Sequence, residues 1–122
     1  MIDIHTHILP NIDDGAKTIQ ESVEMCRIAY EDGIRHIIAT PHCYEGLPNN
    51  NGKACADTIV KLVNQLNNEI SFDLKVYPGS SVHLSHNMVD LLSEKKFFLS
   101  LNNTCYILLE IPSYIATFHK DL

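Results

Sequence analysis

The 122-residue chain has few basic residues for its number of acidic ones. It contains 9 lysines and arginines against 15 aspartates and glutamates, which gives a formal net charge of −6 at pH 7. Neutralisation of phosphates supplies most of the affinity of nucleic-acid-binding proteins, so an acidic chain without a basic run argues against that class. The same charge balance suits a site that collects metal cations.

The sequence also lacks paired cysteines and long apolar runs. Its 4 cysteines form no C-x-x-C motif, so we do not expect a disulfide framework. No apolar run approaches the roughly 20 residues of a membrane helix, and the first residues do not have the basic start and long apolar stretch of a signal peptide. We therefore expect a cytoplasmic protein with reduced thiols and no membrane insertion.

Length and composition are typical of a single globular domain. Hydrophobic residues make up 45% of the chain and charged residues 20%, and a chain of this size can bury a modest core. No linker, repeat or low-complexity segment divides residues 1–122. The 7 histidines are many for this length, and histidine is the commonest metal ligand in proteins.

Four apolar segments alternate with amphipathic segments along the chain. The sequence predicts strands at 1–4, 34–40, 72–77 and 106–111. It predicts helices at 19–32, 54–69 and 87–92, and the tail at 115–122 is a candidate for another. Apolar strands that alternate with helices indicate an α/β protein with a parallel sheet covered on both faces.

Local signals mark several ends of these elements. Thr18 and Glu21 fit a capping box at the start of the first helix, and Gly33 fits a stop at its end. Pro41 and the pair Pro78-Gly79 are expected to end the second and third strands.

Good metal ligands stand at three of the four predicted strand ends. His5 and His7 follow the first strand, His42 follows the second, and Glu110 closes the fourth. In parallel α/β proteins these ends carry the site. Residues i and i+2 of an extended segment point to the same side, so His5 and His7 can present two imidazoles to one ion. Each histidine alone also fits an ordinary polar role, but together the four residues predict a metal site.

Glu110 strengthens this prediction because it ends an apolar run. A carboxylate is costly to bury without a partner, and a metal shared with the histidines would supply one. Histidine and carboxylate ligands without thiolates suit manganese, iron or zinc. Such ions support hydrolysis, because one ion lowers the pKa of bound water and a second polarises a phosphoryl oxygen.

Three stretches carry a resemblance to a known family: MIDIHTHILPNIDDGAKTIQESVEM, IIATPHCYEG and YILLEIP. They resemble the PHP (polymerase and histidinol phosphatase) superfamily and, within it, the manganese-dependent bacterial tyrosine-protein phosphatases of capsule and exopolysaccharide loci. The resemblance covers residues 1–122. It implies a distorted, seven-stranded, TIM-like parallel β/α barrel with a multinuclear metal cluster at its mouth.

The resemblance also implies roles for particular residues. It places His5, His7, His42 and Glu110 at metal-ligand positions. The implied substrate is phosphotyrosine on the tail of a capsule-regulating tyrosine autokinase, attacked directly by metal-bound hydroxide, with no catalytic side chain assigned beyond it.

Asp13 and Asp14 have two interpretations that the sequence leaves open. One of them could orient a metal-binding histidine from behind. Alternatively, both are turn residues that lead into Gly15.

Two features depart from the family pattern. Ser81 stands where the family has a metal-binding glutamate, and a neutral hydroxyl is a poor substitute for a charged ligand. His83 is a candidate substitute, against the interpretation that it is a surface or supporting histidine. The chain supplies about four of the seven strands, and a whole β/α barrel needs about 250 residues. We therefore expect an incomplete, N-terminal part of the domain with exposed strand edges.

Three functions remain open at this point. The first is a metal-dependent tyrosine phosphatase, active or inactive as this shortened chain. The second is a histidinol-phosphate-like phosphatase of small phosphoesters. The third is a non-catalytic, degenerate fragment that binds the kinase or a sister subunit, and a homo-oligomer is compatible with each.

His36 is expected to pack in its strand or face a helix, His86 and His119 are assigned no site role, and Cys43 is expected to be a small buried thiol rather than a ligand.

Overall fold

The computed structural model describes residues 1–43, 53–84 and 100–111. The helix predicted at 87–92 and the candidate helix of the tail lie outside these ranges, as do His86, His119 and the side chain of Cys43. In chain order the elements are β1 (Ile2–Thr6), α1 (Ile19–Glu31), β2 (His36–Ala39), β3 (His42–Cys43), α2 (Lys53–Glu69), β4 (Lys75–Pro78), β5 (Ser81–His83), the 3₁₀ turn η1 (Leu101–Asn103) and β6 (Leu108–Glu110).

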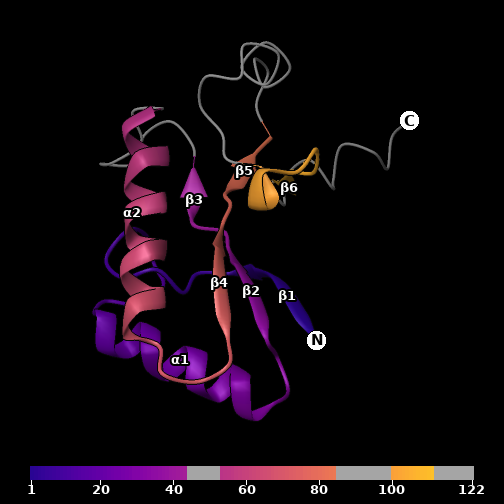
Figure 1. Ribbon diagram of the computed structural model, residues 1–122. Helices are drawn as coiled ribbons and strands as arrows, with labels where there is room; N and C mark the ends of the chain where they lie inside the picture. Colours follow the sequence, from indigo (N-terminus) through magenta and orange to yellow (C-terminus); the bar gives the residue numbers. More distant parts are fainter. Residues whose placement is uncertain (44–52, 85–99, 112–122) are drawn as a thin grey trace.

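The strands form two small parallel sheets (Figure 1). One sheet has the order β1-β2-β4 and the other β3-β5-β6, and each of the four pairings is parallel. The predicted α/β class with parallel strands is therefore confirmed. All four predicted strands exist, although β2, β4 and β6 are shorter than the apolar runs that predicted them.

The second and third strands end at the predicted breaks, but a further short strand follows each of them almost at once. Only Thr40 and Pro41 separate β2 from β3, and only Gly79 and Ser80 separate β4 from β5. Proline has no N–H to donate, so the ladder is interrupted. It resumes at once, because the Pro41 carbonyl accepts a hydrogen bond from the amide of Ser81 at 2.9 Å. Each strand thus bends into a second sheet, where β6 joins it.

Helix α1 begins and ends close to the predicted residues. The Thr18 hydroxyl accepts a hydrogen bond from the Glu21 amide at 3.2 Å. The Glu21 carboxylate accepts from the Lys17 amide at 2.6 Å, one residue before the partner that an ideal capping box uses. Gly33 follows the helix with φ 91°, a conformation that glycine adopts without a steric penalty.

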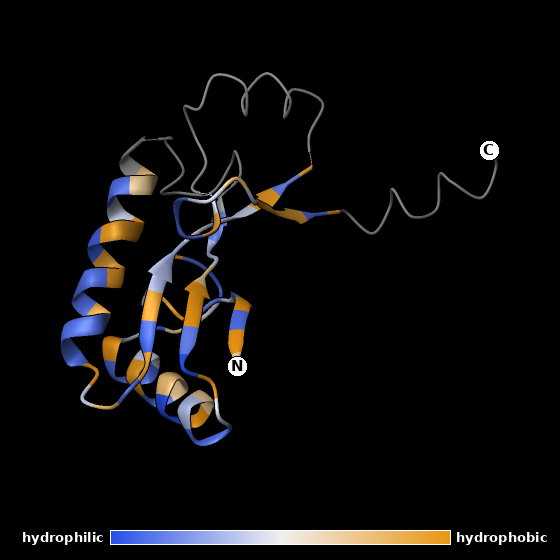
Figure 2. Cartoon of the chain, turned by 45° about the vertical axis from the view of Figure 1, so that its right-hand side comes forward, coloured by the Kyte–Doolittle hydropathy of each residue, from blue (hydrophilic) through white to orange (hydrophobic). Residues whose placement is uncertain are grey.

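The hydrophobic core lies between the helices and the first sheet. Figure 1 shows α2 running alongside the strands, and Figure 2 shows apolar residues recurring between polar ones along this helix. The fully buried members of the core come from both helices, from β2 and β4, and from the loop after β1; the largest are Leu9, Cys26, Ile37, Ile59, Leu66 and Val76. Burial of this apolar surface is the main force that holds the helices on the sheet.

The prediction that both faces of the sheet are covered is wrong for the described residues. Ile2 and Ile4 of β1 remain 61% and 50% exposed. His36 is exposed as well, and its Nδ1 lies 3.2 Å from the hydroxyl of Tyr77 on β4, so it faces a strand neighbour rather than a helix. Helices α1 and α2 thus cover the opposite face, which carries the buried residues Ile37 and Val76.

Backbone groups at the outer edge of β4 form hydrogen bonds with a side chain from α2. The Asn67 amide donates to the Val76 carbonyl at 2.8 Å, and its oxygen accepts from the Val76 amide at 2.9 Å. This pair of bonds substitutes for a neighbouring strand at that position. Among the described residues, no helix combines the length and apolar character that crossing a membrane requires.

The packing of α1 predicts different reactivity for two thiols. Cys26 is fully buried, and this burial raises the pKa of its thiol to about 12, whereas Cys105 is exposed. The thiolate is the form that reacts with alkylating agents. Iodoacetamide at about pH 8 should therefore modify Cys105 and spare Cys26 until the protein is unfolded. Peptide mass spectrometry measures both, and equal labelling of the two in the folded protein would contradict this packing.

Candidate metal centre

The candidate site begins at the end of β1, where the strand is irregular. The register with β2 shifts between Asp3 and Thr6, and the Asp3 carboxylate accepts a hydrogen bond from the His5 amide at 3.0 Å. Such irregularities re-aim side chains at the ends of sheets. The rings of His5 and His7 lie with their centroids 5.7 Å apart, close enough to approach a common ion, as their spacing predicted.

Asp13 joins three parts of the site. Its carboxylate accepts hydrogen bonds from His7 Nδ1 at 2.7 Å, from the Gly15 amide at 2.9 Å and from the His42 amide at 3.1 Å. Burial by itself raises the pKa of this carboxyl, but the three hydrogen bonds and the His7 charge outweigh that effect, so the pKa lies below its usual value. The carboxylate is therefore ionised at neutral pH and acts as an acceptor only.

This contact determines which nitrogen of His7 can bind a cation. Because an ionised carboxylate cannot donate, the neutral form of His7 carries its single proton on Nδ1, and in that form the lone pair of Nε2 is left for a ligand. A carboxylate behind a histidine is the usual support for a metal-binding imidazole. Asp13 therefore fits both interpretations that the sequence left open: it orients a histidine, and it also accepts the Gly15 amide as a turn residue does.

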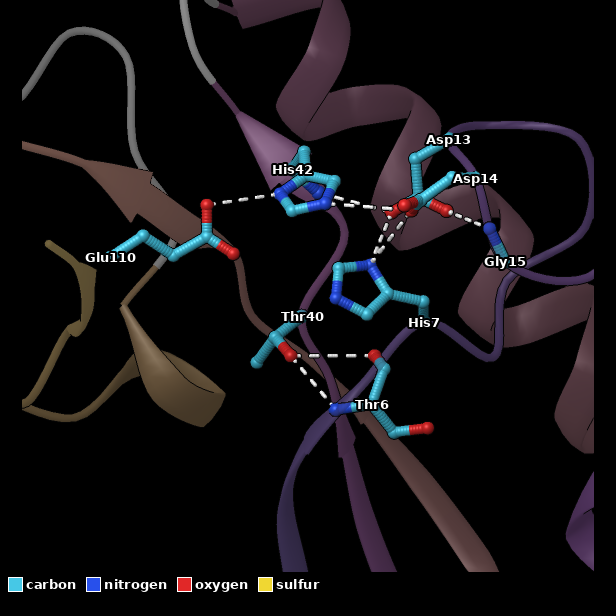
Figure 3. A network of polar contacts seen from close by, with 8 residues as sticks. All are labelled: Thr6, His7, Asp13, Asp14, Gly15, Thr40, His42 and Glu110. Atoms are coloured by element: carbon cyan, nitrogen blue, oxygen red, sulfur yellow. Dashed lines mark hydrogen bonds and ion pairs between the residues drawn. The ribbon is translucent and has the colours of Figure 1, made fainter. Parts of the chain in front are cut away.

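His42 lies between carboxylates on two sides. Its Nδ1 is 3.1 Å from Glu110 Oε2, and its Nε2 is 3.4 Å from Asp14 Oδ1. Figure 3 shows the rings of His7 and His42 side by side, with Glu110 on one side and the two aspartates on the other; the ring centroids are 4.4 Å apart. Asp14 differs from its neighbour Asp13, because its side chain is 78% exposed and that of Asp13 is 1% exposed.

The structure brings the four predicted ligands into one region, in two overlapping groups. Potential ligand atoms of His5, His7 and Glu110 lie within 4.8 Å of one another. So do those of a second group, which consists of His7, Asp13, Asp14 and His42. Neither group holds all four predicted residues, but His7 belongs to both, and His42 contacts Glu110 across them.

The donor set fits a divalent transition metal. The two groups combine imidazole nitrogens with carboxylate oxygens, and neither group found among the described residues includes a thiolate. Manganese, iron and zinc accept such mixed nitrogen and oxygen ligands. With neutral histidines the three carboxylates of Asp13, Asp14 and Glu110 leave the region negatively charged, which favours a cation.

Strand β5 lies directly beside these residues. Ser81 is in register with His42 on β3, and His83 is in register with Glu110 on β6. Register partners on adjacent strands lie about 4.8 Å apart and point to the same face. The segment for which the resemblance implied a departure from the family is thus part of the same region, with Ser81 fully buried and His83 half-buried.

Sequence reasoning missed Thr40, which lies beneath the histidines. Its buried hydroxyl accepts a hydrogen bond from the Thr6 amide at 3.0 Å and is 3.3 Å from the Thr6 carbonyl. This pair of contacts holds the backbone between His5 and His7 against β2 (Figure 3). A threonine before a proline gives no distinct signal of such a role in the sequence.

The loop after β1 also depends on Gly15, which the sequence marked only as a turn residue. A Cβ at this position would overlap the carbonyl oxygen of His7 and lie 2.7 Å from the His7 Cβ. Only glycine lets the loop pass this close to the histidine. The D-D-G triplet was the available signal.

Replacement of the two neighbouring aspartates should have different effects on stability. Asp13→Ala leaves the amides of Gly15 and His42 without their acceptor, so we expect the free energy of unfolding to fall by about 2 kcal/mol. Asp14→Ala is the matched control, and as an exposed substitution it should stay within about 0.5 kcal/mol of the wild type. Urea denaturation of the metal-free proteins measures both, and equal effects would contradict the role of Asp13.

Gly15→Ala tests the close approach of the loop to His7. The added methyl group forces the loop away from the His7 carbonyl, and small-to-large changes at tight positions cost typically 1–3 kcal/mol. We expect a lower thermal midpoint by circular dichroism and weaker binding of Mn²⁺. Gly33→Ala is a useful comparison: it is strained by its positive φ, but no atom lies within 4 Å of the added carbon, so Mn²⁺ binding should be unchanged. Loss of Mn²⁺ affinity in both variants would point to a general effect of instability.

Comparisons with known proteins identify the family of this chain. The model of a family described as capsular polysaccharide synthesis, CpsB/CapC, matches residues 1–119. The chain is 44% identical over 112 residues to the tyrosine-protein phosphatase YwqE of Bacillus subtilis. This match covers 92% of this chain and 43% of the relative. It is 32% identical over 116 residues to the tyrosine-protein phosphatase CpsB of Streptococcus pneumoniae, a match that covers 95% of this chain and 47% of the relative.

A solved structure is similar over nearly the whole chain. It comes from work on YwqE of Bacillus subtilis and CpsB of Streptococcus pneumoniae, described as unique metal-dependent tyrosine phosphatases, and it matches with a TM-score of 0.76 and 40% sequence identity. The match covers 99% of this chain and 50% of that one. The chain thus spans about half the length of the relatives it matches. The resemblance predicted from the sequence is confirmed: this chain belongs to the CpsB/CapC family of capsular polysaccharide synthesis.

Proposed function

We propose that this chain carries part of the metal centre of a metal-dependent protein-tyrosine phosphatase that acts in capsule synthesis. One observation carries the proposal most directly: the histidines at and just after the end of β1 and at the start of β3 meet a glutamate at the end of β6. These residues are far apart in the sequence, and an ordinary surface would not bring three imidazoles and several carboxylates together. The relatives named above are tyrosine phosphatases, which supports the choice of reaction.

We propose His5, His7, His42 and Glu110 as the ligands and manganese as the metal. A bound divalent ion supplies an activated water and polarises a phosphoryl oxygen. Among the residues of this chain, Asp13 would hold the proton on His7 Nδ1, which would leave Nε2 to bind the ion. Asp14 adds negative charge at the exposed rim beside His42, at 3.4 Å from its Nε2. Ser81 would take the position at which the resemblance implies a metal-binding glutamate.

The proposal extends to the rest of the domain and to its substrate. Residues 1–122 would form the first four β/α units of a seven-stranded PHP-type barrel, and the open face that exposes Ile2 and Ile4 would receive its remaining part. The substrate would be phosphotyrosine on the tail of a capsule-regulating tyrosine autokinase in the cytoplasm. Self-association of the chain is a further part of this proposal, since an open sheet edge favours pairing.

Metal binding is the first test. We expect the metal-free chain to bind Mn²⁺ in isothermal titration calorimetry, and His7→Ala and Glu110→Ala to weaken this binding by at least about 10-fold. His36→Ala is the matched control, because His36 is a strand histidine whose ring contacts Tyr77 instead of the site; its affinity should equal that of the wild type. Absence of Mn²⁺ binding, or binding that survives both site substitutions, would overturn the proposed centre.

Hydrolysis distinguishes the three functions that the sequence left open. The chain with Mn²⁺ is given a phosphotyrosyl peptide, histidinol phosphate and p-nitrophenyl phosphate, and released phosphate is measured. Preference for the peptide supports the tyrosine phosphatase, whereas preference for histidinol phosphate supports the small-molecule alternative. Bound Mn²⁺ without turnover would identify a non-catalytic chain. Full turnover that survives His5→Ala and Glu110→Ala would refute the ligand assignment.

A further inference from the structure

The side chain of Ser81 is buried in an unusual way. Its exposed fraction is 0%, and within the described part of the chain its hydroxyl oxygen is the buried side-chain atom that has no hydrogen-bond partner. Burial of a hydroxyl without a partner is unfavourable, so buried polar groups are nearly always satisfied. An exception calls for a physical explanation, and a ligand that the hydroxyl contacts when bound is one.

The sheet determines where this hydroxyl points. Ser81 lies on the central strand of the β3-β5-β6 sheet, and its register partners are His42 on β3 and Leu108 on β6. Partners in a parallel ladder share a face, so the Ser81 side chain stands beside that of His42. Two residues further along each strand, His83 and Glu110 are partners on the same face. The hydroxyl therefore belongs to the face on which His42 meets Glu110 at 3.1 Å.

We propose that Ser81 is a fifth ion-binding residue of this chain, which offers its hydroxyl as a neutral oxygen ligand beside His42. This inference rests on the proposed metal centre. A hydroxyl oxygen is a hard donor that suits Mn²⁺, and it adds no negative charge. It follows that the residue costs stability when no ion is bound and contributes affinity when one is.

The opposite signs of these two effects make the test selective. Ser81→Ala removes the unsatisfied oxygen, so the thermal midpoint of the metal-free protein should rise by roughly 4 °C. The same variant should bind Mn²⁺ about 10-fold more weakly than the wild type in calorimetry. Ser80→Ala is the matched control: Ser80 is the neighbouring, equally buried serine, and unlike that of Ser81 its side chain is not left without a hydrogen-bond partner. Its substitution should lower the midpoint or leave it unchanged, without an effect on Mn²⁺ affinity.

A second pair of variants tests position 81 by an expected gain in Mn²⁺ affinity instead of a loss. Ser81→Glu adds a charged ligand and should tighten Mn²⁺ binding by at least about 10-fold, whereas Ser81→Gln, of nearly equal size but neutral, should not. Mn²⁺ binding that all Ser81 variants leave unchanged would overturn the inference alone, as would a Ser81→Ala midpoint below that of the wild type. Absence of Mn²⁺ binding by the wild type would overturn the proposed metal centre, and this inference with it.

Discussion

The buried carboxylate of Asp13 is the constraint on which the site depends. It is ionised, it accepts hydrogen bonds from one ring and two backbone amides, and it thereby connects the loop after β1 to the start of β3. A single acceptor thus determines the tautomer of His7 and the distance between His7 and His42. Without it, the backbone amides of Gly15 and His42 would be left unpaired, which is why geometry and stability are coupled here.

The bends in the two central strands are the second requirement. At Thr40-Pro41 and at Gly79-Ser80 the chain leaves one sheet and enters the other. Strand β6 therefore pairs with β5 and not with β4, and at the free edge of β4 the Asn67 side chain makes the hydrogen bonds instead. The bend brings the end of β6 back over the end of β1. Glu110 therefore reaches the histidines, although the two segments lie on strands that do not pair.

The sequence predicted the element types and several of their ends, but it did not predict the two short strands β3 and β5. Capping at Thr18 and the stop at Gly33 were readable because they depend on local hydrogen bonds and on one backbone angle. The resumption of pairing after Pro41 was not readable, because it depends on an amide supplied by Ser81, 40 positions further along the chain, to the Pro41 carbonyl. The open face of the first sheet was missed for a similar reason: apolar strands look alike whether or not something covers them.

For this protein, the identity and spacing of a few residues determined the parallel α/β class, the candidate ligands and the family, because these depend on local pattern and on residue chemistry. Only the tertiary structure shows that Asp13 rather than Asp14 contacts His7 most closely and that the Thr40 hydroxyl holds the end of β1 at Thr6. The same is true of the burial of Ser81 beside His42. The contacts of Thr40 and Ser81 join segments distant in the chain and arise from strand register and packing, whereas that of Asp13 depends on how the loop after β1 folds back on His7.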